Sequence, residues 1–146
     1  MASDLQDDGA TSAATKAVPA RVSPYSDDDL TFFHDLILDK RRAAVEDIES
    51  MRHQMADARD QAENDTAYSF HMADAGTDAM EREKLYLMLA RQQKYVGYLD
   101  RALERIDNGT YGLCKVSGRP IPKARLMAVP HTETSIEAKQ QQQKGR

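Results

Sequence analysis

The chain has 146 residues and a net charge of −4; 30% of its residues are charged, only 6% are aromatic, and there is no Trp. This composition favours long solvated helices over a wide globular core. No apolar run approaches the ~20 residues of a membrane span, the N-terminus lacks a signal-peptide pattern, and a single Cys excludes an internal disulfide framework. We therefore expect a cytoplasmic protein without a membrane segment.

Charge is unevenly distributed along the chain. Residues 27–112 hold 11 basic and 19 acidic side chains (11 − 19 = −8), whereas residues 113–146 hold 7 basic and 2 acidic ones (7 − 2 = +5). The C-terminal part is therefore the part suited to meet a polyanion or an acidic protein surface. The chain as a whole lacks the basic surface of an autonomous DNA-binding protein, so we expect no sequence-specific DNA binding.

The N-terminal part predicts a disordered tail followed by a helix. Residues 1–25 are rich in Ala, Asp, Ser and Thr and show no periodicity. Ser26 can cap a helix whose first turn, residues 27–29, is acidic as the helix dipole favours. Two heptad-spaced apolar rows follow, one of Leu30, Ile37, Ala44, Met51 and Ala58, the other of Ile48, Met55 and Ala62.

A second helix is predicted to begin near Asp78, which with Glu81 resembles a capping box, and to end at Asn108–Gly109. It also carries two rows, one of Leu85, Gln92, Leu99 and Ile106, the other of Leu89, Val96 and Leu103. Neither helix can bury its rows alone, so residues 26–108 are predicted to form an antiparallel coiled-coil hairpin. The polar interruptions, His34 and Arg41 in the first helix and Gln92 in the second, would set its register.

Residues 64–77 are predicted to be the tip of this hairpin, because they contain Gly76 and small polar residues between the two helices. The segment displays an acid, Asp74, together with Tyr68, Phe70, His71 and Met72. An exposed loop of this kind is more often a contact surface than a packing accident. The alternative is that its apolar side chains cap the end of the rows.

Residues 109–146 predict a small zinc-finger-like α/β module. The stretch YGLCKVSGRPIP indicates two short extended segments around a Ser-Gly turn, Pro122 opens a short helix, and a C-terminal helix is capped near Thr134. The apolar residues expected in its core are Leu113, Val116, Ile121, Leu126, Met127 and Ile136. The predicted fold is mainly α, with a long coiled-coil hairpin, this module and a disordered N-terminal tail.

Several segments resemble the DksA/TraR family of bacterial regulators that bind RNA polymerase. The runs ERIDNGTYGLC, GRPIPKARL and VPHTETSIEAK resemble the family's C-terminal finger, and HMADAGTDAMERE resembles the coiled-coil tip of its shorter members. The similarity covers roughly residues 28–140. It implies a cytoplasmic transcription regulator whose partner is RNA polymerase.

The resemblance implies a finger in which four cysteines bind zinc. The four positions fall here on Cys114, Ser117, Ser135 and Ala138, so only one can supply a thiolate. Structural zinc needs four good ligands, and adding the nearby His131 would give only a weak, open site. We therefore expect no zinc and no other cofactor, and the ~10 kcal/mol that zinc contributes to such modules must come from packing.

The resemblance also implies that the coiled coil enters the secondary channel of RNA polymerase, where an acidic tip residue alters open-complex stability. The family's tip motif, D-x-x-D-x-A, falls on His71, Asp74 and Gly76, so Asp74 keeps the second acid while the first is lost. Arg91 matches a basic helix position that contacts the polymerase rim. The residues at positions that bind ppGpp in some members are Tyr98, Val129 and Lys139, and with a single cation among them we expect no ppGpp synergy.

Two other functions stay open. A Gre-type transcript-cleavage factor also inserts a coiled coil, but it needs closely spaced tip carboxylates for Mg²⁺, and Asp65 and Asp78 are set back from Asp74. A coiled-coil adaptor would self-associate, whereas we expect a monomer. No enzyme is visible, since Ser117 and Ser135 lack an accompanying base and Cys114 is expected to be a small packed residue.

Overall fold

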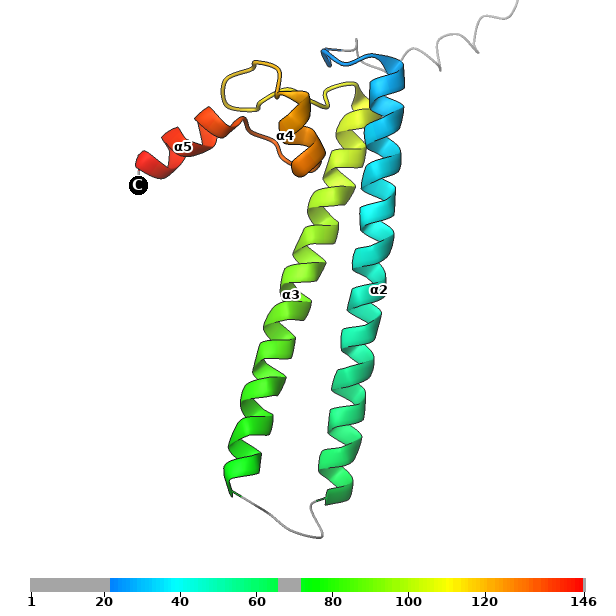
Figure 1. Cartoon of the computed structure of the whole chain (residues 1–146), viewed down its shortest axis with the longest axis vertical. Helices are drawn as coiled ribbons and strands as arrows, with labels where there is room; N and C mark the ends of the chain where they lie inside the picture. Colours follow the sequence, from blue (N-terminus) through cyan, green and yellow to red (C-terminus); the bar gives the residue numbers. More distant parts are fainter. Residues whose placement is uncertain (1–21, 66–71, 146) are drawn as a thin grey trace, which may run out of the picture. The chain divides into compact units, whose positions relative to one another are not determined.

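The protein is described by a computed structural model that covers residues 22–65 and 72–145, with side chains at 22–61 and 78–145. The chain forms four helices in this part (Figure 1), which are α2 (Asp27–Asp65), α3 (Met72–Asn108), α4 (Lys123–Ala128) and α5 (Ile136–Lys144). The mainly α fold is therefore confirmed. The described residues hold no strand, and the predicted extended segments form one antiparallel bridge between Leu113 and Pro120.

The chain divides into two compact units. We call residues 36–100 the hairpin unit, and residues 1–35 together with 101–146 the base unit. Helices α2 and α3 each contribute residues to both units. None of the helices in the described part is both long enough and apolar enough to cross a membrane.

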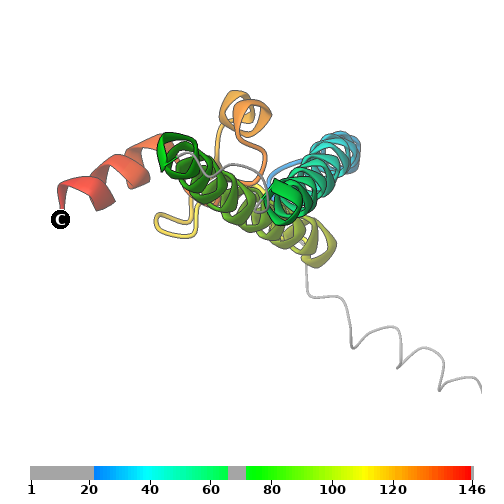
Figure 2. The same cartoon turned by 90° about the horizontal axis from the view of Figure 1, so that it is seen from below.

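In the hairpin unit, α2 and α3 lie side by side (Figures 1 and 2) and run antiparallel. Arg41 Nε donates to Asp100 Oδ1 at 2.6 Å, and Gln92 Nε2 donates to Asp47 Oδ2 at 3.1 Å. The earlier of the two α2 residues, Arg41, thus contacts the later α3 residue, Asp100. The later α2 residue, Asp47, contacts the earlier α3 residue, Gln92, as antiparallel helices require. Arg41 and Gln92, two of the three polar residues that interrupt the predicted rows, thus link the two helices and specify their register. The third, His34, lies 3.4 Å from Asp35 of its own helix.

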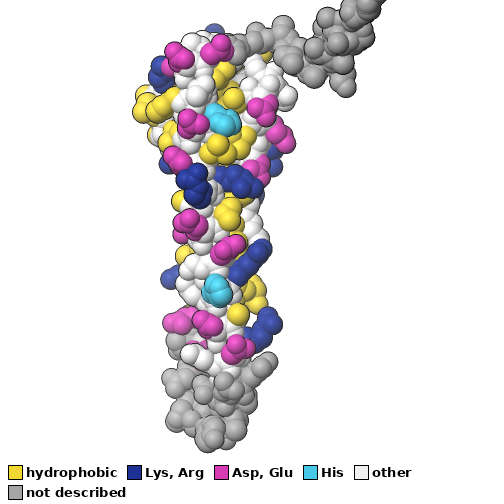
Figure 3. Space-filling view, turned by 90° about the vertical axis from the view of Figure 1, so that its right-hand side faces the viewer, with side chains coloured by type: hydrophobic (Ala, Val, Ile, Leu, Met, Phe, Trp, Pro, Cys, Tyr) yellow, Lys and Arg dark blue, Asp and Glu magenta, His cyan; other side chains and the backbone are white. Residues whose placement is uncertain are grey.

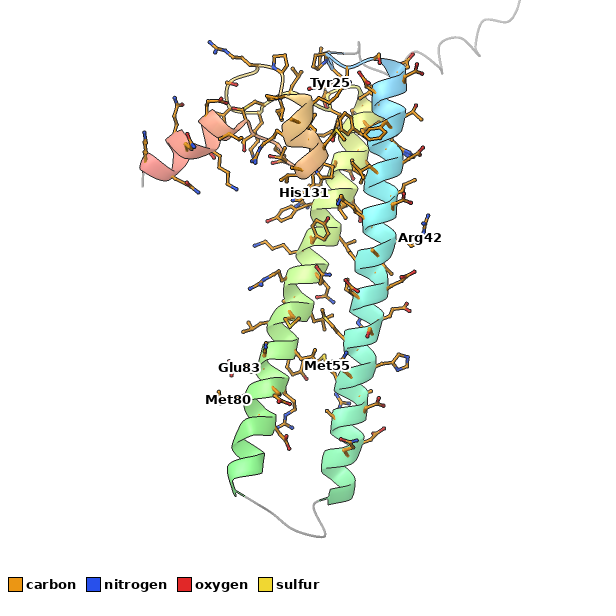
Figure 4. All side chains as sticks on the ribbon, in the orientation of Figure 1. Tyr25, Arg42, Met55, Met80, Glu83 and His131 are labelled. Atoms are coloured by element: carbon orange, nitrogen blue, oxygen red, sulfur yellow. The ribbon has the colours of Figure 1, made fainter. Side chains whose placement is uncertain are left out.

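The two predicted apolar rows are confirmed as the seam of the coiled coil. Every row residue whose side chain is described is buried or half-buried. Ile37 and Leu99 are fully buried, whereas Met55 and Leu85, nearer the loop, are only half-buried. Met55 points into the space between the two helices (Figure 4). Packing is therefore densest at the end of the hairpin unit remote from the loop.

The helix ends follow the predicted signals in two cases and depart from them in one. Ser26 Oγ accepts a hydrogen bond from the Asp29 amide at 3.2 Å, and Gly109 follows α3 with φ 78°. Helix α3, however, begins at Met72, so the capping box predicted at Asp78 is wrong. Residues 73–79 include three alanines, the best helix former, and the one glycine among them, at a cost of about 1 kcal/mol, does not stop the helix.

A short segment before α2 forms a strap across the base unit. The amides of Val22 and Ser23 donate to the Gly109 carbonyl at 3.0 and 2.8 Å, and Ser23 Oγ donates to the Tyr111 carbonyl at 2.5 Å. The Tyr25 hydroxyl donates to the Ile121 carbonyl. The predicted tail therefore ends earlier than residue 25, while residues 1–21 lie outside the described part of the chain.

Aromatic side chains form the centre of the base unit. The ring of the fully buried Phe33 lies 5.9 Å from Tyr25 and 5.5 Å from Tyr111, measured between centroids. The buried Tyr111 hydroxyl donates to the Pro130 carbonyl at 2.7 Å, so its polar atom is satisfied. These contacts join the strap and the start of α2 to the finger-like module.

The predicted core of the module is correct only in part. Ile121 and Leu126 are fully buried and Leu113 is half-buried, but Val116, Met127 and Ile136 are each about half exposed, so their assignment to the core is wrong. Val116 lies in the turn, Met127 follows Leu126 onto the outer side of α4, and Ile136 is the first residue of α5. Tyr111, Cys114, Pro130 and Ala138 fill the core instead.

The contact between the strap and the module predicts different costs for two glycines. Gly112 has φ 92°, and a Cβ there would lie 2.6 Å from the Tyr25 ring; Gly118 has φ 74° but open space around it. Gly118→Ala should cost about 1–2 kcal/mol of unfolding free energy through backbone strain. Gly112→Ala should cost a further ~1–3 kcal/mol through overpacking.

Urea denaturation of both variants measures this difference. Adding Tyr25→Ala should remove most of the additional cost of Gly112→Ala, because the clashing ring is then absent. Equal costs for the two glycine variants would show that the strap does not pack on Gly112.

Candidate functional site

The predicted tip residues lie where the two helices of the hairpin unit approach the loop. Asp74 is the third residue of α3 and Gly76 is the fifth, and both have helical backbone. His71 lies outside the described residues, as do Tyr68 and Phe70. The structure thus places the Asp74 backbone at the loop end of the hairpin unit, remote from the end where Ile37 and Leu99 are fully buried. The proposed roles of His71, Asp74 and Gly76 remain predictions.

Arg91 lies on α3 in the middle of the hairpin unit. Its side chain is exposed, and within the part of the chain that the structure describes it forms no ion pair. A guanidinium in this state can pair with a partner's carboxylate without first breaking an internal contact.

The four positions that correspond to zinc ligands each have a structural role in the base unit. Cys114 is 1% exposed, and its sulfur accepts a hydrogen bond from the Ser117 amide at 3.4 Å. Ser117 Oγ accepts from the Arg119 amide at 3.3 Å, which supports the turn. Ser135 Oγ accepts from the Ala138 amide at 3.2 Å and caps α5, and the Ala138 methyl group is buried.

Hydrogen bonds around the sulfur change the acidity of Cys114. Burial raises the pKa of the thiol, but hydrogen bonds from Ser117 and from the backbone of Ser135 and Val116 outweigh burial and lower the pKa from 9.0 to about 6. The structure therefore brings two of the other predicted positions, 117 and 135, to the sulfur of Cys114.

These residues do not fit a structural zinc ion. Across the described residues there is no group of three or more His, Cys, Asp or Glu side chains placed to hold a metal. Zinc requires four tetrahedral ligands of this kind. The set 114, 117, 135 and 138 offers one thiolate, two hydroxyls that already accept hydrogen bonds, and a methyl group.

Ion pairs link parts of the module that a metal would otherwise connect. Glu133 accepts from Arg105 Nη1 at 3.1 Å and from Lys115 Nζ at 2.9 Å, and Arg105 Nη2 donates to the His131 carbonyl at 3.2 Å. The side-chain hydrogen bond from Lys115 lowers the pKa of Glu133. Sequence reasoning missed this link, because isolated charges without periodic spacing give no signal that they will meet.

The positions that correspond to the ppGpp site give no additional cation. Tyr98 and Lys139 are exposed and Val129 is half-buried. Tyr98 belongs to the hairpin unit and the other two residues to the base unit. The expectation of no ppGpp synergy therefore stays a prediction.

Comparison with known proteins identifies relatives of both units. Residues 109–144 match the family model described as the prokaryotic dksA/traR C4-type zinc finger. The chain is 29% identical over 128 residues to the RNA polymerase-binding transcription factor DksA of Caulobacter vibrioides (strain NA1000 / CB15N), covering 86% of this chain and 84% of that protein.

Further similarity is found to an uncharacterized protein and to a solved structure. The chain is 39% identical over 72 residues to the uncharacterized protein YteA of Bacillus subtilis (strain 168), covering 49% of this chain but only 30% of YteA. The structure of transcription factor DksA2 from Pseudomonas aeruginosa superimposes with a TM-score of 0.70 at 30% identity, covering 82% of this chain and 86% of that one. The likeness therefore includes the hairpin as well as the module.

The environment of Cys114 predicts a thiolate near neutral pH. Because the chain has one Cys, thiolate absorbance at 240 nm reports on this residue alone. The titration midpoint of the folded chain should lie near pH 6, against about 9 in denaturant.

The pH dependence of the free energy of unfolding should follow the same two pKa values of Cys114, about 6 in the folded chain and about 9 in the unfolded chain. Between them the unfolded chain binds more protons than the folded chain, so the free energy of unfolding should rise with pH from about 6 to about 9. Cys114→Ala should abolish this rise. A folded-state midpoint near 9 would contradict the proposed hydrogen bonding.

Proposed function

The chain belongs to the DksA/TraR family, and from this premise we propose that it is a transcription regulator that binds RNA polymerase. The observation that supports this most is the match to DksA2, which extends over 86% of that chain and includes the hairpin. We place its action in the cytoplasm, where the polymerase works, and we assign it no catalytic activity of its own.

The mechanism that we propose is insertion of the hairpin unit into the polymerase secondary channel. The paired helices would act as one stiff element, because the seam and the contacts Arg41–Asp100 and Gln92–Asp47 hold them together. Asp74, near the loop end of this unit, would present a carboxylate to the mobile elements at the catalytic centre. Regulation would then arise from unequal binding to different states of the open promoter complex.

We propose further that the module functions without structural zinc. The hydrogen-bonded Cys114, the cap formed by Ser135 and the contacts of Glu133 support this proposal. So does the aromatic packing of Tyr25, Phe33 and Tyr111. We also propose that the chain binds RNA polymerase as a monomer. It would act without synergy with ppGpp and without recognising a DNA sequence.

Transcript cleavage and an adaptor role are the alternatives. Cleavage would need a second carboxylate beside Asp74 to hold Mg²⁺, and Asp78 lies one helical turn further along α3. Release of 3′ fragments from backtracked polymerase would support cleavage. Stable self-association by light scattering would support the adaptor.

The role proposed for Asp74 predicts a specific loss in the Asp74→Asn variant. With the carboxylate charge removed, the variant should bind polymerase like the wild type but no longer change the lifetime of open complexes. Asp78→Asn is the matched control, since it removes the same charge one turn along α3 and should keep the effect. Competitor-challenged open-complex decay measures the lifetime, and an unchanged effect in Asp74→Asn would overturn the assignment.

If the module contains no zinc, a metal chelator should not change the stability of the protein. Protein purified without chelator should contain well under one zinc per chain by mass spectrometric metal analysis. EDTA should leave the melting temperature unchanged, because no metal contributes to folding. Stoichiometric zinc together with a large loss of stability in EDTA would contradict the proposal.

A further inference from the structure

The four zinc-ligand positions of the module lie in two segments of the base unit. Two of them belong to residues 114–119, which we call the turn segment, and two to residues 131–138, which we call the cap segment. A zinc ion would bond to both segments and so join them. Because the residues present do not fit zinc, other contacts must hold the two segments together.

The two segments contain little large apolar surface with which to pack on each other. Val116 in the turn segment and Ile136 in the cap segment are each 49% exposed. The side chains that are buried in these segments are small; they are Cys114, Thr132, Ser135 and Ala138. Since apolar stabilisation scales with the area that is buried, packing alone would hold the segments weakly.

Glu133 of the cap segment contacts the turn segment twice. Its carbonyl accepts a hydrogen bond from the Lys115 amide at 2.9 Å, and its carboxylate accepts one from Lys115 Nζ at 2.9 Å. The other carboxylate oxygen accepts from Arg105 Nη1 at 3.1 Å. We call Arg105, Lys115 and Glu133 the Glu133 clamp. It joins both segments to the last turn of α3.

The pair with Arg105 is the stronger part of the Glu133 clamp. Charged side chains of both signs are common on the surface of the chain (Figure 3), and exposed ion pairs contribute little to stability. The Lys115 side chain is 63% exposed, whereas the Arg105 side chain is only 21% exposed. Burial lowers the pKa of Arg105, and the Glu133 carboxylate opposes that effect. Loss of the carboxylate would therefore leave a largely buried cation uncompensated, which costs more than loss of an exposed pair.

The sulfur of Cys114 lies where the two segments meet. It accepts hydrogen bonds from Ser117 of the turn segment and from the backbone of Ser135 of the cap segment. Separating the segments would break both contacts between Lys115 and Glu133 and would also remove Ser135 from the sulfur. Because Cys114 is only 1% exposed in the closed module, access to its sulfur reports whether the segments are together.

We infer that the Glu133 clamp closes the module in the place of a metal, and that its release is the local opening that exposes Cys114. The inference rests on the part of the proposed function by which the module binds no zinc. Dissolved salt screens partly exposed ion pairs. The module should therefore open more often as the ionic strength rises.

The test measures how fast the disulfide reagent DTNB labels the single cysteine of the full chain under native conditions. Glu133→Gln removes the carboxylate charge but keeps the shape of the side chain, and it should be labelled about tenfold faster than wild type or more. Lys115→Gln removes only the exposed partner and should increase the rate by a smaller factor. Added NaCl should accelerate labelling of the wild type more than that of Glu133→Gln.

Glu137→Gln is the matched control. It removes the same charge from an exposed residue of the cap segment that forms no ion pair among the described residues. Loss of one acid from the first turn of a helix costs little, so labelling should stay within about threefold of wild type. Far-ultraviolet circular dichroism and melting curves verify that each variant folds.

Urea separates local opening from unfolding of the whole chain. The dependence of an opening reaction on urea scales with the surface that it exposes. Opening of the module alone exposes less surface than global unfolding, so the labelling rate should rise less steeply with urea than the global unfolding constant does.

Three results would overturn the inference in distinguishable ways. If EDTA accelerates labelling of the wild type, a metal holds the module, and the proposed absence of zinc falls together with the inference. If EDTA has no effect but Glu133→Gln is labelled like Glu137→Gln, the clamp is wrong while the zinc-free module stands. If labelling follows urea as steeply as global unfolding does, Cys114 is exposed only when the whole chain unfolds, and the local opening is wrong.

Discussion

The pairing of α2 with α3 is the constraint on which the hairpin unit depends. Each helix carries an apolar seam that it cannot cover by itself, and burying both seams requires an antiparallel partner. The cross-links Arg41–Asp100 and Gln92–Asp47 exclude alternative registers, since a shift of one helix would separate their polar groups. Among the described side chains of this unit, burial is greatest near Ile37 and Leu99 and lower at Met55 and Leu85, nearer the loop.

The base unit shows how a finger-like module can be organised with one cysteine. The sulfur of Cys114 accepts amide hydrogen bonds, the two serines support a turn and a helix end, and an alanine fills the remaining space. A strap from outside the module adds aromatic packing and hydrogen bonds to the Gly109, Tyr111 and Ile121 carbonyls. Stabilisation is thus distributed over many weak contacts, and under the proposal that the module binds no zinc, a chelator would leave them intact.

Features with a period or a local signature could be predicted from the sequence, and features that arise from unique tertiary contacts could not. The heptad rows, the Ser26 cap and the stop at Gly109 were all readable, as was the deficient ligand set around Cys114. The strap of residues 22–25 was not, because Tyr25 meets Gly112 only once the chain has folded. The core of the module was predicted in part, since a segment without periodicity does not reveal which side of a turn or of α4 faces inward. The start of α3 could not be predicted from the capping pattern at Asp78, because that pattern lies inside a helix that has already begun at Met72.

The central claim is that the loop end of the hairpin unit reaches the catalytic centre of RNA polymerase. Placing a photo-crosslinking amino acid at position 74 and mapping the crosslinked polymerase peptides measures this most directly. The account predicts crosslinks to segments that line the catalytic centre and the inner end of the secondary channel. Crosslinks confined to the outer surface of the enzyme, or none from a variant that still binds, would contradict it.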